Sequence, residues 1–309
     1  LQYIITIIII LIIFSAILFY ALDKNIRDTF EIDFLDEQIQ EELITKTIDR
    51  LQATIFSIDF IVLLITGILS YILAGETLKP IKEAMDRQKQ FVANASHELR
   101  TPLAVMRTNL EVALREKDLN QEKNRALVAS AIDEIKLMST LTEDLLTLSR
   151  FENKQTEYQF QKVDITEIIK RVVKKMQNIA DKHGVQLSVV TPDDAFIYGN
   201  STMLEQVITN ILSNAIRFTP ASGHVEVIAS KRDGNIVITV KDTGRGIAKE
   251  DLPHVFERFY RADKARSSDG TGLGLAIAQE IIHNHRGAIT IQSELGKGTL
   301  VTITFPSFT

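Results

Sequence analysis

Two long apolar segments near the N-terminus constrain the fold of this chain most strongly. Residues 1–22 are mostly Ile, Leu, Phe and Ala and contain no charged side chain. As a helix they would extend about 33 Å at about 1.5 Å per residue, enough to cross the hydrocarbon core of a bilayer. A cleaved signal peptide would have a shorter apolar region and a small-residue cleavage site. We therefore expect a first transmembrane helix here, and the initial Leu indicates that the native N-terminus lies upstream.

Residues 53–75 form the second apolar segment, which we expect to be a second transmembrane helix. Its one carboxylate, Asp59, lies close enough to the end of the segment to reach the membrane interface. Residues 23–52, between the two segments, are too few for a sensor domain with its own core, and we expect a short extracytoplasmic loop, helical or disordered. Basic residues occur on both sides of the second segment, so the positive-inside rule leaves the orientation open.

Length and charge bound the rest of the chain. With 309 residues, there is room for two further domains after the apolar segments. The net charge of −5, from 35 basic and 40 acidic residues, provides no electrostatic footprint for nucleic acid, which we do not expect as a partner. Because the chain has no cysteine, disulfide frameworks and cysteine-ligated metal sites are excluded.

Residues 76–153 show the pattern of a helical hairpin. Apolar residues, together with the polar residues Lys82, Lys89 and Ser96 between them, recur at alternating spacings of three and four. This spacing indicates the seam of a helical bundle. These seam residues are Leu78, Met85, Val92, Leu99, Leu103, Met106, Leu110 and Ala113. A charged turn at 116–124 precedes a second amphipathic stretch. Two such helices cannot bury both apolar stripes alone, so we expect a homodimer that forms a four-helix bundle.

His97 lies beside seam position Ser96, at the expected edge of the bundle. A lone histidine on a helix is usually a surface residue or a satisfied core residue, but the string FVANASHELRTPL around it resembles the phosphoacceptor box of the sensor histidine kinases of two-component systems. A neutral imidazole is a nitrogen nucleophile at physiological pH. The resemblance implies that His97 accepts phosphate, that Glu98 acts as base, and that Thr101 positions water for dephosphorylation of the partner.

The other five histidines are interpreted as loop or helix-end residues without a metal partner. They are His183, His224, His254, His283 and His285. We place the last two at the end of a helix, where cations are favoured.

From residue 160 to residue 306 the pattern changes to mixed helices and strands. Helices are expected at 165–180, 203–218 and 272–284, and strands at 185–190, 225–230, 236–241, 288–294 and 299–305. Asp233-Gly234-Asn235 predicts a tight turn between two of these strands. Helices combined with a mixed sheet of hairpins predict a two-layer α/β sandwich.

Four motifs follow one another in this region: NILSNAIRF, DTGRGI, FERFYR and GTGLGLAIAQEI. In the first, Asn210 and Asn214 share a helix face, and amide oxygens are ligands that suit Mg²⁺ beside a phosphate. In the second, Asp242 can accept a hydrogen bond from an amino group. The fourth is a glycine-rich loop that leads into a helix start, where backbone N–H groups bind phosphate.

A dinucleotide fingerprint is an alternative interpretation of GTGLGL, but it requires a preceding strand. The charged segment 261–269 precedes this motif instead, and it indicates a mobile lid.

Together the four motifs resemble, in order and spacing, the N, G1, F and G2 boxes of the histidine kinase catalytic domain, whose fold is shared with gyrase, Hsp90 and MutL. The resemblance implies that Asp242 contacts the adenine amino group, that Asn210 holds Mg²⁺, and that Asn214 and Arg217 contact phosphates. Arg217 stands where the family usually has Lys, and Phe218 where Tyr is common. The remaining residues expected at the nucleotide are Gly244, Gly246, Arg258, Arg261, Gly270, Thr271, Gly272, Leu273 and Gly274.

The resulting hypothesis is a membrane-bound histidine kinase with cytoplasmic catalytic domains. It would use ATP and Mg²⁺, lie in the lipid bilayer as a homodimer, and pass its phosphate to a separate response regulator. One alternative is an ATPase clamp of the gyrase or Hsp90 type. Such clamps carry a Glu as base where this chain has Asn210, and an amide cannot accept a proton from water. A catalytically degenerate membrane receptor is the other alternative.

Overall fold

The computed structural model describes residues 2–29, 37–115, 121–152, 158–262 and 270–308. The chain divides into two compact units, residues 1–89 and 90–309.

The first unit consists of two helices. Helix α1 (Gln2–Thr29) contains the first expected span, and the second expected span lies in α2 (Glu37–Arg115), which continues into the second unit. Among the described residues, α2 is the one helix that is long and apolar enough to cross a membrane. Large apolar side chains of its segment 53–75 are exposed, Phe56 by 65% and Phe60 by 69%. The expected loop at 23–52 is helical at both ends, and its residues 30–36 lie outside the described part.

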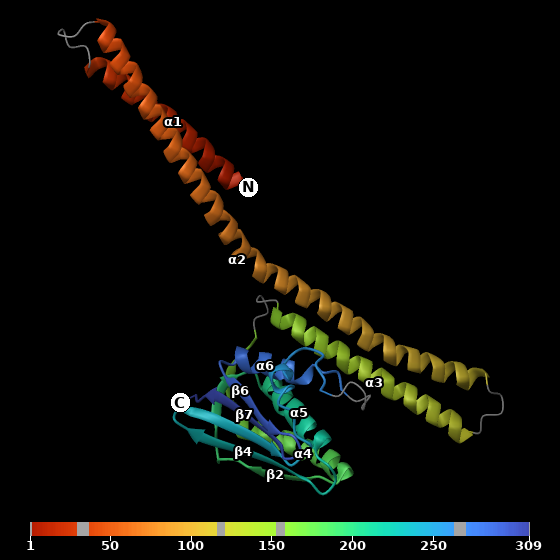
Figure 1. The fold of residues 1–309 in the computed structure, drawn as a ribbon. Helices are drawn as coiled ribbons and strands as arrows, with labels where there is room; N and C mark the ends of the chain where they lie inside the picture. The colour runs from red at the N-terminus through yellow and green to blue at the C-terminus, as the bar shows by residue number, and fades with distance from the viewer. Residues whose placement is uncertain (1, 30–36, 116–120, 153–157, 263–269, 309) are drawn as a thin grey trace. The chain divides into compact units, whose positions relative to one another are not determined.

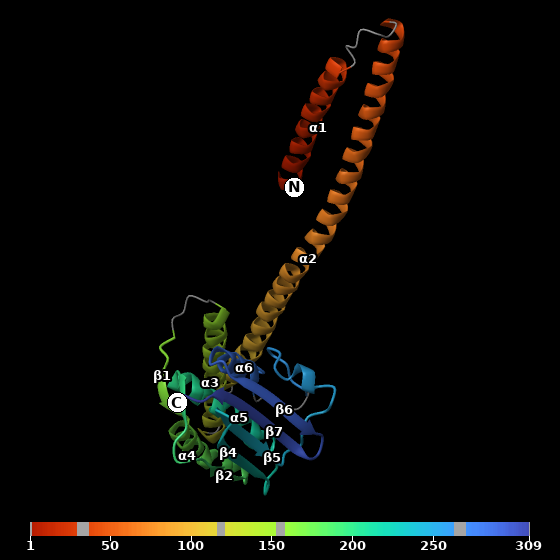
Figure 2. The same ribbon diagram turned by 90° about the vertical axis from the view of Figure 1, so that its left-hand side faces the viewer.

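In the second unit, the end of α2 and α3 (Gln121–Glu152) run antiparallel as the expected hairpin (Figures 1 and 2). Asn109 Nδ2 donates to Ser130 Oγ across the pair at 3.1 Å. The hairpin leaves a set of apolar side chains exposed, among them Leu103, Leu110, Leu114, Val128, Ile132 and Ile135. This apolar surface is what a bundle with a second hairpin would bury. Of the expected turn at 116–124, residues 116–120 lie outside the described part.

The rest of the second unit is the predicted two-layer α/β sandwich. Its five-stranded sheet has the order β2-β4-β5-β7-β6, with β2 parallel to β4 and the other pairs antiparallel. These strands are β2 (Gln186–Val190), β4 (His224–Arg232), β5 (Asn235–Asp242), β6 (Ala288–Glu294) and β7 (Gly298–Pro306). Alternate residues of β4 and β5 are buried, which indicates that one face of the sheet is covered.

Helices α4 (Ile165–His183), α5 (Ser201–Phe218) and α6 (Gly274–Asn284) supply the apolar layer on that face (Figure 2). The side chains of Asp164 and Asn200 cap α4 and α5, accepting from the backbone N–H of Thr166 and of Met203. The predicted turn is present, with Asp233 and Gly234 in the left-handed region. The predicted helices and strands thus lie within three residues of their expected ends.

The structure adds elements that were not predicted from the sequence. A two-stranded antiparallel sheet joins β1 (Gln161–Asp164) to β3 (Phe196–Gly199), and a short 3-10 helix covers Leu252–His254.

His285 lies at the end of α6 as expected, but it is buried and neutral there, which corrects its interpretation as a cation at a helix end. Its ring is only 5% exposed and stacks on Phe160, with the centroids 4.6 Å apart. Nε2 accepts from the backbone N–H of Asn200 at 2.9 Å, so Nδ1 must carry the proton that it shares with the Ile281 carbonyl at 2.7 Å. The neutral imidazole therefore connects the end of α6 to the start of α5, and burial lowers its pKa.

We expect this histidine to make the folded state less stable in acid. The unfolded chain takes up a proton on this ring near pH 6.5, whereas the folded chain does so only at lower pH. The free energy of unfolding should therefore fall as pH drops below 6.5. His285→Gln should remove that part of the dependence, although it is expected to lower stability at all pH values. Denaturant titrations over the range in which histidine ionises, about pH 5–8, would check this. Parallel plots of the free energy of unfolding against pH for the two proteins would contradict it.

Candidate functional site

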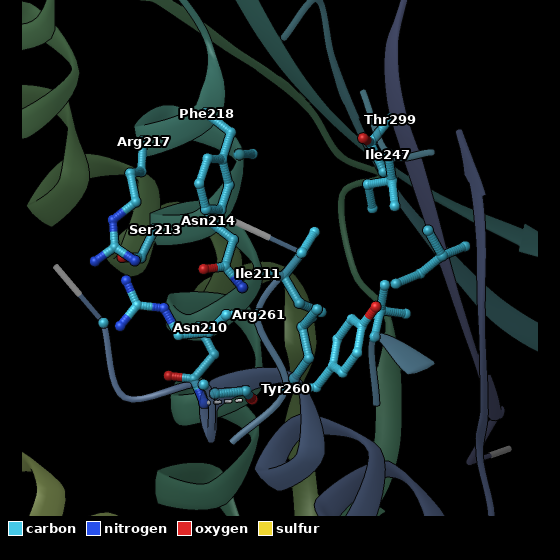
Figure 3. A pocket seen from close by; sticks show the side chains of 18 of the residues that line it. Asn210, Ile211, Ser213, Asn214, Arg217, Phe218, Ile247, Tyr260, Arg261 and Thr299 are labelled. Atoms are coloured by element: carbon cyan, nitrogen blue, oxygen red, sulfur yellow. Dashed lines mark hydrogen bonds between the residues drawn. The ribbon is translucent and has the colours of Figure 1, made fainter. Parts of the chain in front are cut away.

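A cavity of about 600 Å³ opens between α5, the segment after β5, the start of α6 and one face of α3 (Figure 3). Cavities of this size accommodate small-molecule ligands. Eleven of the fourteen residues expected at the nucleotide line it: Asn210, Asn214, Arg217, Phe218, Asp242, Gly246, Arg261, Gly270, Thr271, Gly272 and Gly274.

Asp242, at the end of β5, forms one end of the cavity. The residue is 7% exposed, and Oδ1 accepts from the backbone N–H groups of Gly244 at 2.8 Å and Thr299 at 3.1 Å. Burial raises the pKa of this carboxyl group, against the effect of the two hydrogen bonds. Among the described residues Oδ2 has no partner, so it can accept a hydrogen bond from a ligand's amino group.

Gly246 allows the backbone after β5 to pass close to the sheet. Its φ is +70°, and a Cβ there would lie 2.1 Å from the carbonyl oxygen of Glu294. No other residue fits that position without a backbone shift, so the segment is held at the cavity wall.

Helix α5 directs three polar side chains to the opposite end of the cavity. Asn210, Asn214 and Arg217 lie on the same side of the helix (Figure 3). Asn210 Nδ2 donates to the carbonyl of Gly274 at 3.0 Å. This bond orients the amide and leaves its oxygen available for a cation.

The start of α6 completes this end. Leu273, the N-cap residue of α6, has no side-chain capping bond, so the N–H groups of the first turn are available to an anion. Gly270 lies against Arg217, since a Cβ there would be 2.3 Å from the arginine Nη1. Arg217, Arg245 and Arg261 all line the cavity, and Arg245 lies over the Phe218 ring at 4.6 Å. An acceptor at one end, and arginines beside the uncapped start of α6 at the other, suit a nucleotide.

Two protein families match the second unit. Residues 87–154 match HisKA, the His Kinase A (phospho-acceptor) domain, and residues 199–309 match HATPase_c, the histidine kinase-, DNA gyrase B- and HSP90-like ATPase. The sensor histidine kinase RppB of Synechocystis is 37% identical over 242 residues, which are 77% of this chain and 53% of RppB. The chain belongs to the sensor histidine kinases.

Other sensor histidine kinases are also similar. WalK of Bacillus subtilis is 36% identical over 73% of this chain and 38% of its own length. The chain therefore spans about half the length of RppB and less of WalK. Among solved structures, full-length ShkA in complex with AMPPNP superposes with a TM-score of 0.54 at 29% identity, covering 71% of this chain and 46% of ShkA.

The expected phosphoacceptor lies outside the cavity. His97 is exposed on α2, Glu98 beside it is partly buried, and the Thr101 hydroxyl donates to the His97 carbonyl at 3.3 Å. None of these three lines the cavity. The second unit thus contains two separate sites, the cavity that suits a nucleotide and the segment that resembles the family's phosphoacceptor box.

Three of the residues expected at the nucleotide also lie elsewhere. Gly244 packs against the carbonyl of Phe218, and Leu273 is fully buried in the core. Arg258 lies over the ring of Phe91 at 5.3 Å, and that ring contacts Phe259 with the centroids 5.7 Å apart. These contacts join the F box of the kinase to the helix that carries His97. Residues 263–269 of the expected lid lie outside the described part.

Sequence reasoning missed several lining residues. Leu137, Thr140 and Asp144 come from α3, which carries no nucleotide motif. Tyr260 donates to Asp251 Oδ1 at 2.6 Å, and this bond raises the pKa of Tyr260 to about 12. Its place in FERFYR was a signal that could have identified it, whereas α3 offered none.

Proposed function

We propose that this chain is a membrane-anchored histidine kinase that phosphorylates His97 from Mg-ATP and passes the phosphoryl group to an aspartate of a separate response regulator. One observation carries the proposal: the cavity has a buried acceptor, Asp242, at one end and the uncapped start of α6 beside Arg217 at the other. That polarity matches adenine at the first end and a triphosphate at the second.

The residues fit Mg²⁺ and the phosphates. The Asn210 amide, oriented by its bond to Gly274, would offer its oxygen to the ion, and Asn214 and Arg217 would contact the phosphates. Bound Mg²⁺ would neutralise charge on the transferring phosphoryl group. Phe218, paired with Arg245, would provide a flat apolar surface but no hydroxyl group.

At His97, a ring nitrogen would attack the γ-phosphorus while the bond to the ADP oxygen breaks. ADP leaves with that oxygen, and the proton on the other ring nitrogen is shared with Glu98 as base. Thr101, one turn further on, would position water for dephosphorylating the response regulator.

We expect Glu98→Gln to slow phosphorylation of His97 by about 10²-fold, because an amide cannot take up the proton. Nucleotide affinity should be unchanged, since Glu98 does not line the cavity. Initial rates of labelling at saturating ATP, with nucleotide binding measured separately, would check this. A full rate in the variant would remove Glu98 from the base role.

The membrane arrangement is part of the same proposal. Helices at 1–22 and 53–75 would span the membrane twice, with 23–52 outside the cytoplasm. The hairpin would comprise 76–153 and the ATP-binding domain 160–306, both cytoplasmic because ATP is cytosolic. The exposed apolar residues of α2 and α3, such as Leu110 and Ile132, support a homodimer through a four-helix bundle.

The function is tested with the whole chain in detergent micelles, Mg²⁺ and ATP labelled at the γ-phosphate. Protein-bound label that acid removes, that survives alkali and that passes to a receiver protein is expected. ATP hydrolysis without protein label would instead support the ATPase clamp, and absence of nucleotide binding would support the degenerate receptor.

A further inference from the structure

Helix α3 forms one wall of the nucleotide cavity. Leu137, Thr140 and Asp144 line it, at the spacing of three and four that places them on one helix face. Helix α3 also packs against α6. The hairpin therefore contributes one carboxylate, that of Asp144, to the end of the cavity that suits phosphate.

Asp144 lies one hydroxyl group away from the start of α6. Thr271 Oγ1 donates to Asp144 Oδ2 at 3.2 Å, and Thr271 Oγ1 itself accepts from the backbone N–H of Leu273 at 3.3 Å. The carboxylate is thus held by the glycine-rich loop, at the positive end of α6 where the phosphates of a nucleotide are expected.

The surroundings of Asp144 destabilise the ionised form of its carboxyl group. Burial raises the pKa of this carboxyl group to about 6, the Thr271 hydroxyl opposes that shift, and Glu143 adds to it. At neutral pH Asp144 is therefore ionised and partly desolvated. A phosphate arriving at the start of α6 would meet a negative charge in a site that is poorly screened by water.

We propose that Asp144 senses the charge of the bound nucleotide: its carboxylate opposes the phosphates, so that a triphosphate displaces α3 from the glycine-rich loop while adenosine leaves the contact in place. This inference rests on the proposed nucleotide site. By linkage, the factor by which a bound triphosphate weakens the contact of Asp144 with Thr271 equals the factor by which that contact weakens triphosphate binding.

Binding affinity tests the charge dependence. Calorimetric titrations of the whole chain in micelles with Mg²⁺ would compare adenosine, ADP and the non-hydrolysable analogue AMPPNP. Asp144→Asn should bind AMPPNP about fivefold more tightly, ADP by a smaller factor, and adenosine as the unchanged chain does. Glu143→Gln is the matched control, because it removes a neighbouring charge on α3 that does not line the cavity, and it should change none of the three by as much.

Displacement of α3 is measured without any enzymatic turnover. Because the chain has no cysteine, Thr142→Cys on α3 and Gln279→Cys on α6, both exposed, would carry the only two nitroxide labels per chain. Dilution with unlabelled chain would remove distances across a dimer. AMPPNP should lengthen the distance between the labels, and adenosine should not.

The outcomes separate the two proposals. If none of the three ligands binds, the nucleotide site itself is wrong. If they bind but Asp144→Asn changes all three affinities equally, or weakens AMPPNP as loss of an Mg²⁺ ligand would, charge sensing is overturned. An unchanged label distance with AMPPNP bound also overturns it.

Discussion

Replacing His97 with Gln is expected to abolish phosphorylation of the chain. The imidazole supplies the attacking nitrogen, and a Gln amide nitrogen is not a nucleophile at neutral pH. Labelling by ATP should fall by at least about a thousandfold, because removal of a nucleophile removes the whole covalent route. Since His97 is exposed and does not line the cavity, nucleotide affinity and stability should not change.

The measurement is acid-labile label per chain after incubation with ATP, with nucleotide binding measured on the same preparation. His283→Gln is the control, because His283 is also exposed and lies on α6, away from the phosphoacceptor box. It should be labelled normally. Label that persists in His97→Gln and remains acid-labile would mean that another histidine accepts the phosphate.

Replacing Asn210 with Ala should lower the rate of labelling by about 10²- to 10³-fold, not by loss of the nucleophile as in His97→Gln but by loss of a proposed Mg²⁺ ligand. The amide oxygen is the proposed ligand for the ion that neutralises charge on the transferring phosphoryl group, and loss of one such group typically costs this much. The Asn210 side chain also donates to the carbonyl of Gly274 at 3.0 Å, so Ala removes a bond that helps to hold the start of α6.

Adenosine separates the loss of Mg²⁺ from damage to the site. In the proposed site it would contact only the Asp242 end of the cavity, so Asn210→Ala should bind it normally while binding of Mg-AMPPNP weakens. Asn284→Ala changes an exposed residue on α6 whose amide donates to the Glu280 carbonyl of the same helix, and it should leave both affinities and the labelling rate unchanged. Full labelling in Asn210→Ala would remove this residue from the metal site.

Most of the sandwich was predictable because its strands alternate. In β4 residues 225, 227 and 229, and in β5 residues 236, 238 and 240, are apolar and buried, which is the pattern that a strand covered on one face requires. Strands β1 and β3 have four residues each, too few for that alternation to register. The burial of His285 was missed for a related reason: its position at a helix end is local and was predicted, whereas its partner Asn200 lies 85 residues earlier.

The lining residues of the cavity were predictable where they belong to sequence motifs, but not where they reach the cavity through the packing of α3. Asn210, Asp242 and Gly274 belong to patterns with a chemical meaning. Asp144 does not, because its role depends on how α3 lies against the glycine-rich loop, and contacts between elements 127 residues apart leave no local trace. The contact of Phe91 with Phe259 is of the same kind.

The position of β7 has a consequence for synthesis of the protein on the ribosome. This strand is the last in sequence, yet it pairs between β5 and β6, and its Thr299 supplies one of the two N–H groups that hold the Asp242 carboxylate. The apolar helices emerge long before it. During synthesis, the proposed membrane helices would therefore be available for insertion while the cavity still lacks β7, and the Asp242 carboxylate would gain its second N–H donor only once β7 has been translated and paired.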